Sequence, residues 1–157
     1  VALQDGVIVD RFQSLINPGF RVNSFIENYT GISNSMLRDA PGCDAVIPQL
    51  YAFVGDAPIL AHNASFDRGF FDAEYQRAGY RRRQDFVCTM RIARRLYPNA
   101  PNHKLGTLVR YTGVPECGDF HRALADAEMT GPALTFYGLA PRAAVQAATE
   151  TPLEELA

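Results

Sequence analysis

A short apolar run that ends abruptly in a polar cluster constrains the fold more than any other stretch. Ile59-Leu60-Ala61 is followed by His62-Asn63-Ala64-Ser65-Phe66-Asp67, and apolar residues at helical spacing then continue towards Gly79. The pattern predicts a buried strand and then a helix that Ser65 caps and Gly79 stops. Asp67 would lie at the strand-to-helix junction, where open α/β sheets bind their ligands. Its carboxylate would either hold a metal ion there or only complement the helix N-terminus.

The remaining segments alternate between strand and helix patterns. A β-hairpin is predicted where Val1–Leu3 and Val7–Ile16 flank Asp5-Gly6. Helical segments are predicted over Phe25–Thr30, Ser33–Arg38, Cys43–Val54, Thr89–Tyr97 with Thr89 as the cap, Leu105–Tyr111 and Arg122–Tyr137, and another strand over Asp85–Cys88. This order predicts an α/β fold with a mixed sheet and helices packed against it. We expect one domain over residues 1–140 and a C-terminal helix or tail over 141–157.

Charge and cysteine content narrow the classes of function. The formal net charge is -2, so a surface that coats nucleic acid non-specifically is not indicated. A local basic face remains open, although a solvated face is the plainer interpretation of its arginines; these are Arg77, Arg81, Arg82, Arg83, Arg91, Arg94 and Arg95. The scattered Cys43, Cys88 and Cys117 predict a reducing, cytoplasmic compartment rather than disulfides or zinc. No apolar run is long enough for a membrane span, and no signal peptide is visible.

Two histidine–aspartate pairs share one spacing. His62 and Asp67 are five residues apart, and so are His121 and Asp126. A histidine at a loop end often has only a structural role, and Asp126 could simply pair with Arg122 one helical turn away. However, His121 follows a glycine-containing loop and is expected to be mobile, while Asp126 lies among alanine and leucine. Two close carboxylates repel each other unless a metal ion lies between them.

Carboxylates are hard oxygen ligands that select Mg²⁺ or Mn²⁺ over softer metals. Two such ions about 4 Å apart suit phosphodiester hydrolysis, because one activates a water and the other stabilises the departing oxygen. A histidine with a near-neutral pKa can take the proton from that water.

These residues resemble the motifs of one nuclease family. The stretch from His62 to Asp67 is similar to the second motif of the DnaQ-like 3′→5′ exonucleases of the DEDDh group, which includes the proofreading epsilon subunit of DNA polymerase III. His121-Arg122-Ala123-Leu124-Ala125-Asp126 resembles the third motif, H-x-x-x-x-D. The resemblance spans Val1 to Tyr137. Four shorter stretches also resemble the family: Phe12–Pro18, Thr30-Gly31-Ile32, Cys88-Thr89 and His103-Lys104-Leu105.

The resemblance implies a ribonuclease-H-like fold and a role for each matching residue. Asp67 and Asp126 would be ligands of two Mg²⁺ or Mn²⁺ ions, and His121 would be the general base. Asn63 would fix the local geometry, Phe66 would pack beside the terminal nucleotide, and the loop Thr30-Gly31-Ile32 would approach that nucleotide. The substrate would be the 3′ end of single-stranded DNA, degraded to nucleoside monophosphates in proofreading or repair. A DNA polymerase subunit is the partner that a proofreading member would have.

One motif of the family does not occur in the sequence. The first motif, D-x-E, supplies two acidic ligands, yet neither Asp5 nor Asp10 has an acid two residues on. Since the chain begins with Val and its first hairpin lacks a neighbouring strand, we expect that motif to lie upstream of Val1. Without it, residues 1–157 should bind metal weakly, since two carboxylates bring about -2 against +4 for two ions.

Two other functions compete with the nuclease. A non-catalytic nucleic-acid or polymerase-binding module is favoured by the missing D-x-E and disfavoured by the retained His121, because binding needs no general base. A zinc hydrolase that uses His62 and His121 is less consistent with the sequence, which has neither an H-x-x-x-H motif nor a cysteine pair.

Overall fold

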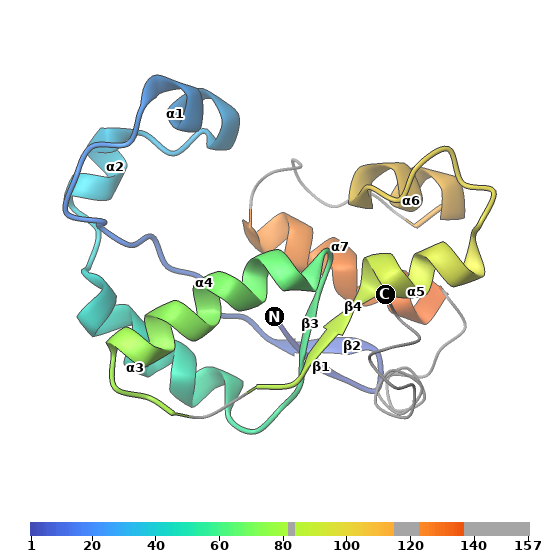
Figure 1. Ribbon diagram of the computed structural model, residues 1–157, viewed down its shortest axis with the longest axis horizontal. Helices are drawn as coiled ribbons and strands as arrows, with labels where there is room; N and C mark the ends of the chain where they lie inside the picture. The colour runs from blue at the N-terminus through green and yellow to red at the C-terminus, as the bar shows by residue number, and fades with distance from the viewer. Residues whose placement is uncertain (82–83, 115–122, 137–157) are drawn as a thin grey trace.

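The predicted alternation of strands and helices is present in the computed structural model, which describes residues 1–81, 84–114 and 123–136 (Figure 1). Its elements are β1 (Ala2–Gln4), β2 (Val7–Asp10), α1 (Ser24–Thr30), α2 (Asn34–Arg38), α3 (Cys43–Val54), β3 (Ile59–Ala61), α4 (Ala64–Arg77), β4 (Phe86–Cys88), α5 (Thr89–Leu96), α6 (Leu105–Thr112) and α7 (Ala123–Phe136). The α/β class is therefore confirmed. None of the helices in the described ranges is long and apolar enough to cross a bilayer.

The first hairpin forms as predicted but is shorter. Asp5 and Gly6 have φ of 51° and 83°, the positive values that a tight type I′ turn requires. β1 and β2 pair antiparallel, with Ala2 opposite Asp10. The prediction that the second strand reaches Ile16 is wrong, since β1 offers no partner residue beyond Asp10.

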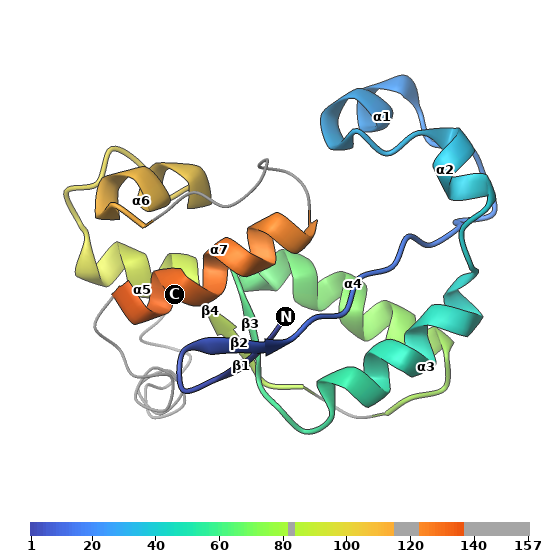
Figure 2. The same ribbon diagram turned by 180° about the vertical axis from the view of Figure 1, so that it is seen from behind.

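The second pair of strands is joined by a crossover helix that positions the candidate site. β3 and β4 run parallel, with Ile59 opposite Phe86 and Ala61 opposite Cys88, and α4 connects them. Within the described residues the strands form these two separate ladders, one antiparallel and one parallel, and not one continuous mixed sheet. Both α4 and α7 contact β3, and α4 begins shortly after that strand ends (Figure 2).

Two predicted helix caps are wrong. α4 begins at Ala64, after Asn63, whose carbonyl accepts a hydrogen bond from the Phe66 amide at 3.0 Å; Ser65 already lies within the helix. α5 begins at Thr89 itself, with Cys88 at the cap position. The Thr89 hydroxyl is instead engaged by His62 and lies 3.4 Å from the Ala61 carbonyl. At α5, tertiary partners have displaced local capping.

Two clusters of the core join β3, α5, α6 and α7. Ala93 and Leu108 are fully buried, and Leu60 packs against them from β3. A second cluster joins α6 to α7 through Val109, Val114, Ala125 and Met129. This packing fixes α7 beside β3, and with it the first turn that carries Asp126.

The helices α1 and α2 form a separate unit. Neither contains a buried residue, and Asn34 ties them together by hydrogen bonds to both the amide and the carbonyl of Val22. The unit joins the rest of the chain through Asn17, whose amide donates to the Pro41 carbonyl at 2.8 Å. Residues next to each helix set its bounds here: Gly31 ends α1 with φ of 69°, and the Ser33 hydroxyl caps α2. Figure 1 and Figure 2 both show this unit standing away from α4 and α7.

Replacing Asn63 with valine is expected to lower the free energy of unfolding by about 1–2 kcal/mol, the cost of holding a side chain that branches at Cβ in the left-handed region. Asn63 has φ of 69° and ψ of 49°. Asparagine tolerates this conformation, and glycine does so without a Cβ penalty. Urea denaturation measures the loss, and Asn63→Gly is the matched control that should lose less. Equal losses in both variants would contradict a backbone role for Asn63.

Candidate active site

His62 is the structural anchor of the candidate site. Its Nε2 lies 2.9 Å from the His103 carbonyl, which can only accept, so Nε2 carries the proton. Nδ1 lies 3.0 Å from Thr89 Oγ1, and in the neutral ring this hydroxyl donates to Nδ1. Both ring nitrogens are therefore hydrogen-bonded, so neither is free to bind zinc as the zinc-hydrolase hypothesis requires. The ring instead ties the end of β3 to the start of α5 and to the loop before α6.

Asp67 and Asp126 both lie close enough to His62 to act on its ionisation. Desolvation lowers the pKa of His62, and the negative charges of Asp67 and Asp126 are among the effects that oppose it. Asp67 comes from the first turn of α4 and Asp126 from the first turn of α7. The structure thus places near one imidazole two carboxylates that are 59 residues apart in the sequence.

The Asp67 carboxylate is poorly stabilised by its protein surroundings. Partial desolvation raises its pKa even though the residue as a whole is exposed, and a backbone hydrogen bond and His62 only reduce that effect. A divalent cation would supply the missing opposite charge. Asp67 and Asp126 therefore fit Mg²⁺ or Mn²⁺ in chemistry. Among the described residues, however, no group of three or more histidine, cysteine or acidic side chains could hold a metal ion.

Stability should fall as the pH is lowered below 6.5, the ordinary pKa of His62. Because burial lowers the pKa of the folded ring, the unfolded chain takes up a proton first and is favoured. The fall should stop once the pH is low enough to protonate the folded ring as well. Urea unfolding at pH values between about 5 and 7.5 measures this slope. His62→Gln should flatten it, and a slope that survives in that variant would assign it to another group.

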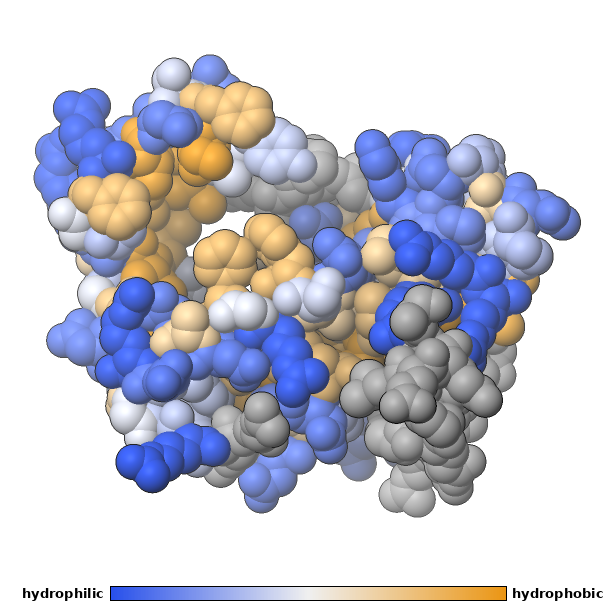
Figure 3. Space-filling model, viewed as in Figure 1, coloured by the Kyte–Doolittle hydropathy of each residue, from blue (hydrophilic) through white to orange (hydrophobic). Residues whose placement is uncertain are grey.

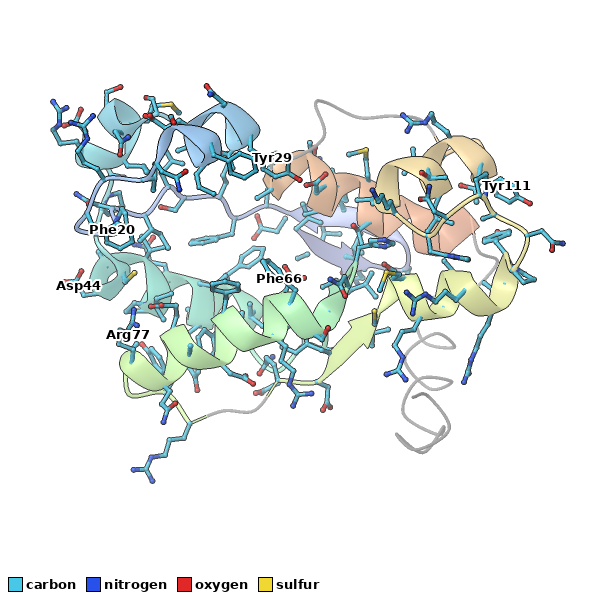
Figure 4. The ribbon with its side chains drawn as sticks, turned by 45° about the horizontal axis from the view of Figure 1, so that its top comes forward. Phe20, Tyr29, Asp44, Phe66, Arg77 and Tyr111 are labelled. Atoms are coloured by element: carbon cyan, nitrogen blue, oxygen red, sulfur yellow. The ribbon has the colours of Figure 1, made fainter. Side chains whose placement is uncertain are left out.

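Two aromatic rings, one before and one after Asp67, lie on one face of α4. Phe66 and Phe70 are 64% and 63% exposed, and their ring centroids are 5.0 Å apart. Figure 4 shows Phe66 on α4 and Tyr29 at the end of α1, on facing sides of the space between the two helices. In the space-filling view the surface is hollowed there (Figure 3). The sequence indicates Phe70 only as part of the apolar pattern of this helix, although its spacing of four residues from Phe66 is a signal that could have assigned it to the site.

The other predicted substrate-binding residues lie in the α1–α2 unit. Thr30 donates its hydroxyl to the Ile26 carbonyl at 2.7 Å and accepts the Ile32 amide at 3.2 Å, and the Gly31 amide donates to Glu27. These hydrogen bonds all stay within the unit. Asn63 lies at the junction itself, where its left-handed backbone turns the chain into α4.

His121 lies outside the described residues, as do its preceding loop, Arg122 and the predicted tail over 141–157. Their predicted roles are untested. Sequence reasoning also missed an ion pair between Arg11 and Glu128, whose atoms lie 2.6 Å apart. It ties the segment after β2 to α7, two residues beyond Asp126.

Comparisons with known proteins all point to one class of protein, the exonucleases and polymerases that contain an exonuclease region. A family model described as Exonuclease (RNase T) matches residues 1–134. PolC-type DNA polymerase III of Halalkalibacterium halodurans is 38% identical over 132 residues, and that of Bacillus cereus is 39% identical over 132; each match covers 83% of this chain and 9% of the relative. The chain thus spans about a tenth of these relatives. A solved structure of exonuclease X in complex with 5′ overhanging duplex DNA has a TM-score of 0.72 and 28% identity, over 94% of this chain and 85% of that one.

Proposed function

The chain belongs to the exonuclease family whose model matches residues 1–134, and on that premise we propose that it is a metal-dependent 3′→5′ exonuclease acting on DNA. Its α/β fold is ribonuclease-H-like, in agreement with its similarity to exonuclease X. The observation that carries the proposal is the placement of Asp67 and Asp126 near one histidine, each in the first turn of its helix.

Asp67 and Asp126 would hold the divalent ion, Mg²⁺ or Mn²⁺. When bound, such ions polarise the phosphodiester and lower the pKa of a water, the chemistry that hydrolysis needs. Two carboxylates balance the charge of one dication, so the second ion of a two-metal site requires further acidic ligands. His121 would accept the proton of the attacking water at its ring nitrogen. His62 would position Asp67 by fixing the end of β3 to α5.

The proposed substrate is the 3′ end of a single strand, from which one nucleoside monophosphate is released at a time. Phe66 and Phe70 support this because exposed rings stack on unpaired bases of any sequence. Thr30, Gly31 and Ile32 would approach the terminal nucleotide from the α1–α2 unit. The similarity to PolC-type polymerases supports a proofreading role with a polymerase as partner, and the DNA-bound exonuclease X supports DNA as the substrate.

A digestion assay tests the proposal. A single-stranded oligonucleotide labelled at its 5′ end should give a ladder that shortens with time at saturating Mn²⁺ or Mg²⁺, and no products in EDTA. The same strand labelled at its 3′ end should release the labelled mononucleotide at once. A ladder from the 3′-labelled strand would reverse the direction and refute the proposal.

A non-catalytic nucleic-acid or polymerase-binding module is the second candidate. It is favoured by the small number of acidic ligands, since the described residues contain no group of three metal-binding side chains. The same oligonucleotides separate the two candidates. Tight binding of the 3′ end with no product at saturating Mn²⁺ would favour the module.

A further inference from the structure

One side-chain hydrogen bond continues the pairing of β3 with β4 beyond the end of their backbone ladder. The ladder ends with Ala61 opposite Cys88. The next residues along the two strands are His62 and Thr89, and the imidazole Nδ1 lies 3.0 Å from the Thr89 hydroxyl oxygen. Both strands lead into helices at this point, β3 into α4 and β4 into α5. This hydrogen bond therefore joins two helix starts that the backbone ladder no longer holds.

The Thr89 hydroxyl is buried and directed at His62. Thr89 is 1% exposed, and the Ala61 carbonyl, the other group near its hydroxyl, is more distant at 3.4 Å. The N-terminus of α5 has no side-chain cap, so the hydroxyl does not serve the helix that it begins. A buried hydroxyl needs a hydrogen-bond partner, whereas a valine of nearly the same shape would need none. His62, and not the local structure of α5, therefore accounts for a threonine at this position.

The opposite side of the imidazole is held by a carbonyl that is itself fixed. His62 Nε2 donates to the His103 carbonyl at 2.9 Å, and the His103 ring Nε2 lies 3.0 Å from the Tyr97 carbonyl. A flip of the His62 ring would break its hydrogen bonds on both sides, and a polar network that is satisfied in this way specifies one orientation. Because the His103 partner is a backbone group, Thr89 is the partner of this ring that a substitution can remove.

The orientation of His62 reaches the candidate metal ligand through the turn that starts α4. Asn63 follows in the left-handed conformation, and its carbonyl accepts the Phe66 amide at 3.0 Å. Ala64 is buried, so the start of the helix is packed in place. Asp67 lies in this first turn. A change in the position of His62 is therefore passed within a few residues to the Asp67 carboxylate.

We infer that Thr89 is a positioning residue of the nuclease: through its hydrogen bond to His62 it fixes the first turn of α4 and with it the direction of the Asp67 carboxylate. The inference rests on the proposed function for the role of Asp67. Thr89 is buried and acts through His62. A misplacement of about 1 Å at the reacting groups can cost about 100-fold in rate, so loss of this bond should lower kcat more than it changes KM.

Steady-state digestion of a short single strand at saturating Mn²⁺ by the full chain tests this role. Thr89→Val removes the hydroxyl and keeps the branched shape, and its kcat should be about 10- to 100-fold below wild type, the usual effect of losing a residue that orients a metal ligand. KM for the strand should change little. Thr89→Ser keeps the hydroxyl and should restore most of kcat. Should the valine variant not fold, Thr89→Cys, a weaker donor, should give an intermediate kcat.

Thr112→Val is the matched control. The Thr112 hydroxyl donates to the Leu108 carbonyl at 2.7 Å within α6, so this variant loses a partly buried threonine hydroxyl away from His62. It should keep the wild-type kcat. Equal losses in Thr89→Val and Thr112→Val would overturn the inference, and so would a wild-type kcat in the folded variant that lacks the Thr89 hydroxyl.

Nitrogen-15 NMR of the full chain without metal measures the positioning itself. The chain has three histidines, so His62→Gln assigns the ring signals of His62. In Thr89→Val, or in Thr89→Cys if valine does not fold, the Nδ1 signal should move towards that of a nitrogen without a hydrogen bond. The backbone amide signals of residues 64–67 should move with it. They should stay in place in Thr112→Val. Unchanged signals of His62 in the Thr89 variant would refute the inference.

The two measurements separate this inference from the proposed function. If the wild-type chain digests the strand and loss of the Thr89 hydroxyl leaves kcat unchanged, only the inference fails. If the wild-type chain digests nothing, the proposed function fails. The positioning of the α4 turn by Thr89 then stands if the amides of residues 64–67 respond to loss of the hydroxyl, and fails if they do not.

Discussion

Asp126→Asn should reduce the rate of DNA hydrolysis by at least about 10³-fold, because metal stabilisation of the transition state is worth several kcal/mol and each 1.36 kcal/mol is a factor of ten. Asp67→Asn should have an effect of similar size, since the two carboxylates lie near the same imidazole and would share the ion. Single-turnover digestion of a 5′-labelled strand measures the loss. Mn²⁺ titration by calorimetry should show weaker binding in both variants.

Asp72→Asn is the matched control for this prediction. Asp72 lies on the same helix as Asp67, and its carboxylate is half-exposed 3.5 Å from Arg68 in a surface ion pair. Such pairs contribute little, so the control should keep both fold and activity. If Asp72→Asn were as inactive as Asp126→Asn, Asp72 would complete the metal site and the assignment of ligands would need revision. Activity retained in Asp126→Asn would refute the site itself.

The parts of the fold that the sequence predicts well are those that neighbouring residues determine. The bounds of α3 and of β3 agree with the prediction to the residue. Gly31 and Gly113 end helices because they adopt positive φ, 69° and 73°, which glycine does at little cost. The Asp5-Gly6 turn follows the same rule. Each of these signals is contained within a few consecutive residues.

The errors arise where a distant partner decides. Threonine is a common helix cap, yet the Thr89 hydroxyl contacts His62, which is 27 residues earlier. The length of β2 depends on how many residues β1 can offer, and no local pattern contains that number. The division of the strands into two ladders is likewise a matter of long-range pairing. Patterns of hydrophobicity predict that a strand exists, not which strand it pairs with.

In the candidate site, too, the sequence predicts what neighbouring residues determine, and contacts between distant residues decide the rest. The sequence favours a structural role for His62 because a histidine at a loop end is more often structural than a ligand, and the geometry agrees, since both ring nitrogens are hydrogen-bonded. The arginines of α5 were interpreted from the sequence as a solvated face. The structure leaves that interpretation unchanged, because Thr89, which contacts His62, lies with Ala93 on the buried side of α5, opposite these arginines. Proximity in space, which the sequence does not contain, therefore decides the role of His62.

His121→Ala should slow hydrolysis by about 10² to 10⁴, the usual contribution of a general base. His121 is proposed to accept a proton and not to ligate metal, so Mn²⁺ affinity should stay within the error of the calorimetric titration. The pH dependence distinguishes this role from a structural one. The wild-type rate should rise with pH through the pKa of His121, because only the neutral ring can accept the proton, and the variant should lose that rise. Parallel loss of metal affinity and activity would instead make His121 a ligand, and a pH profile that is unchanged in His121→Ala would assign proton transfer to another group.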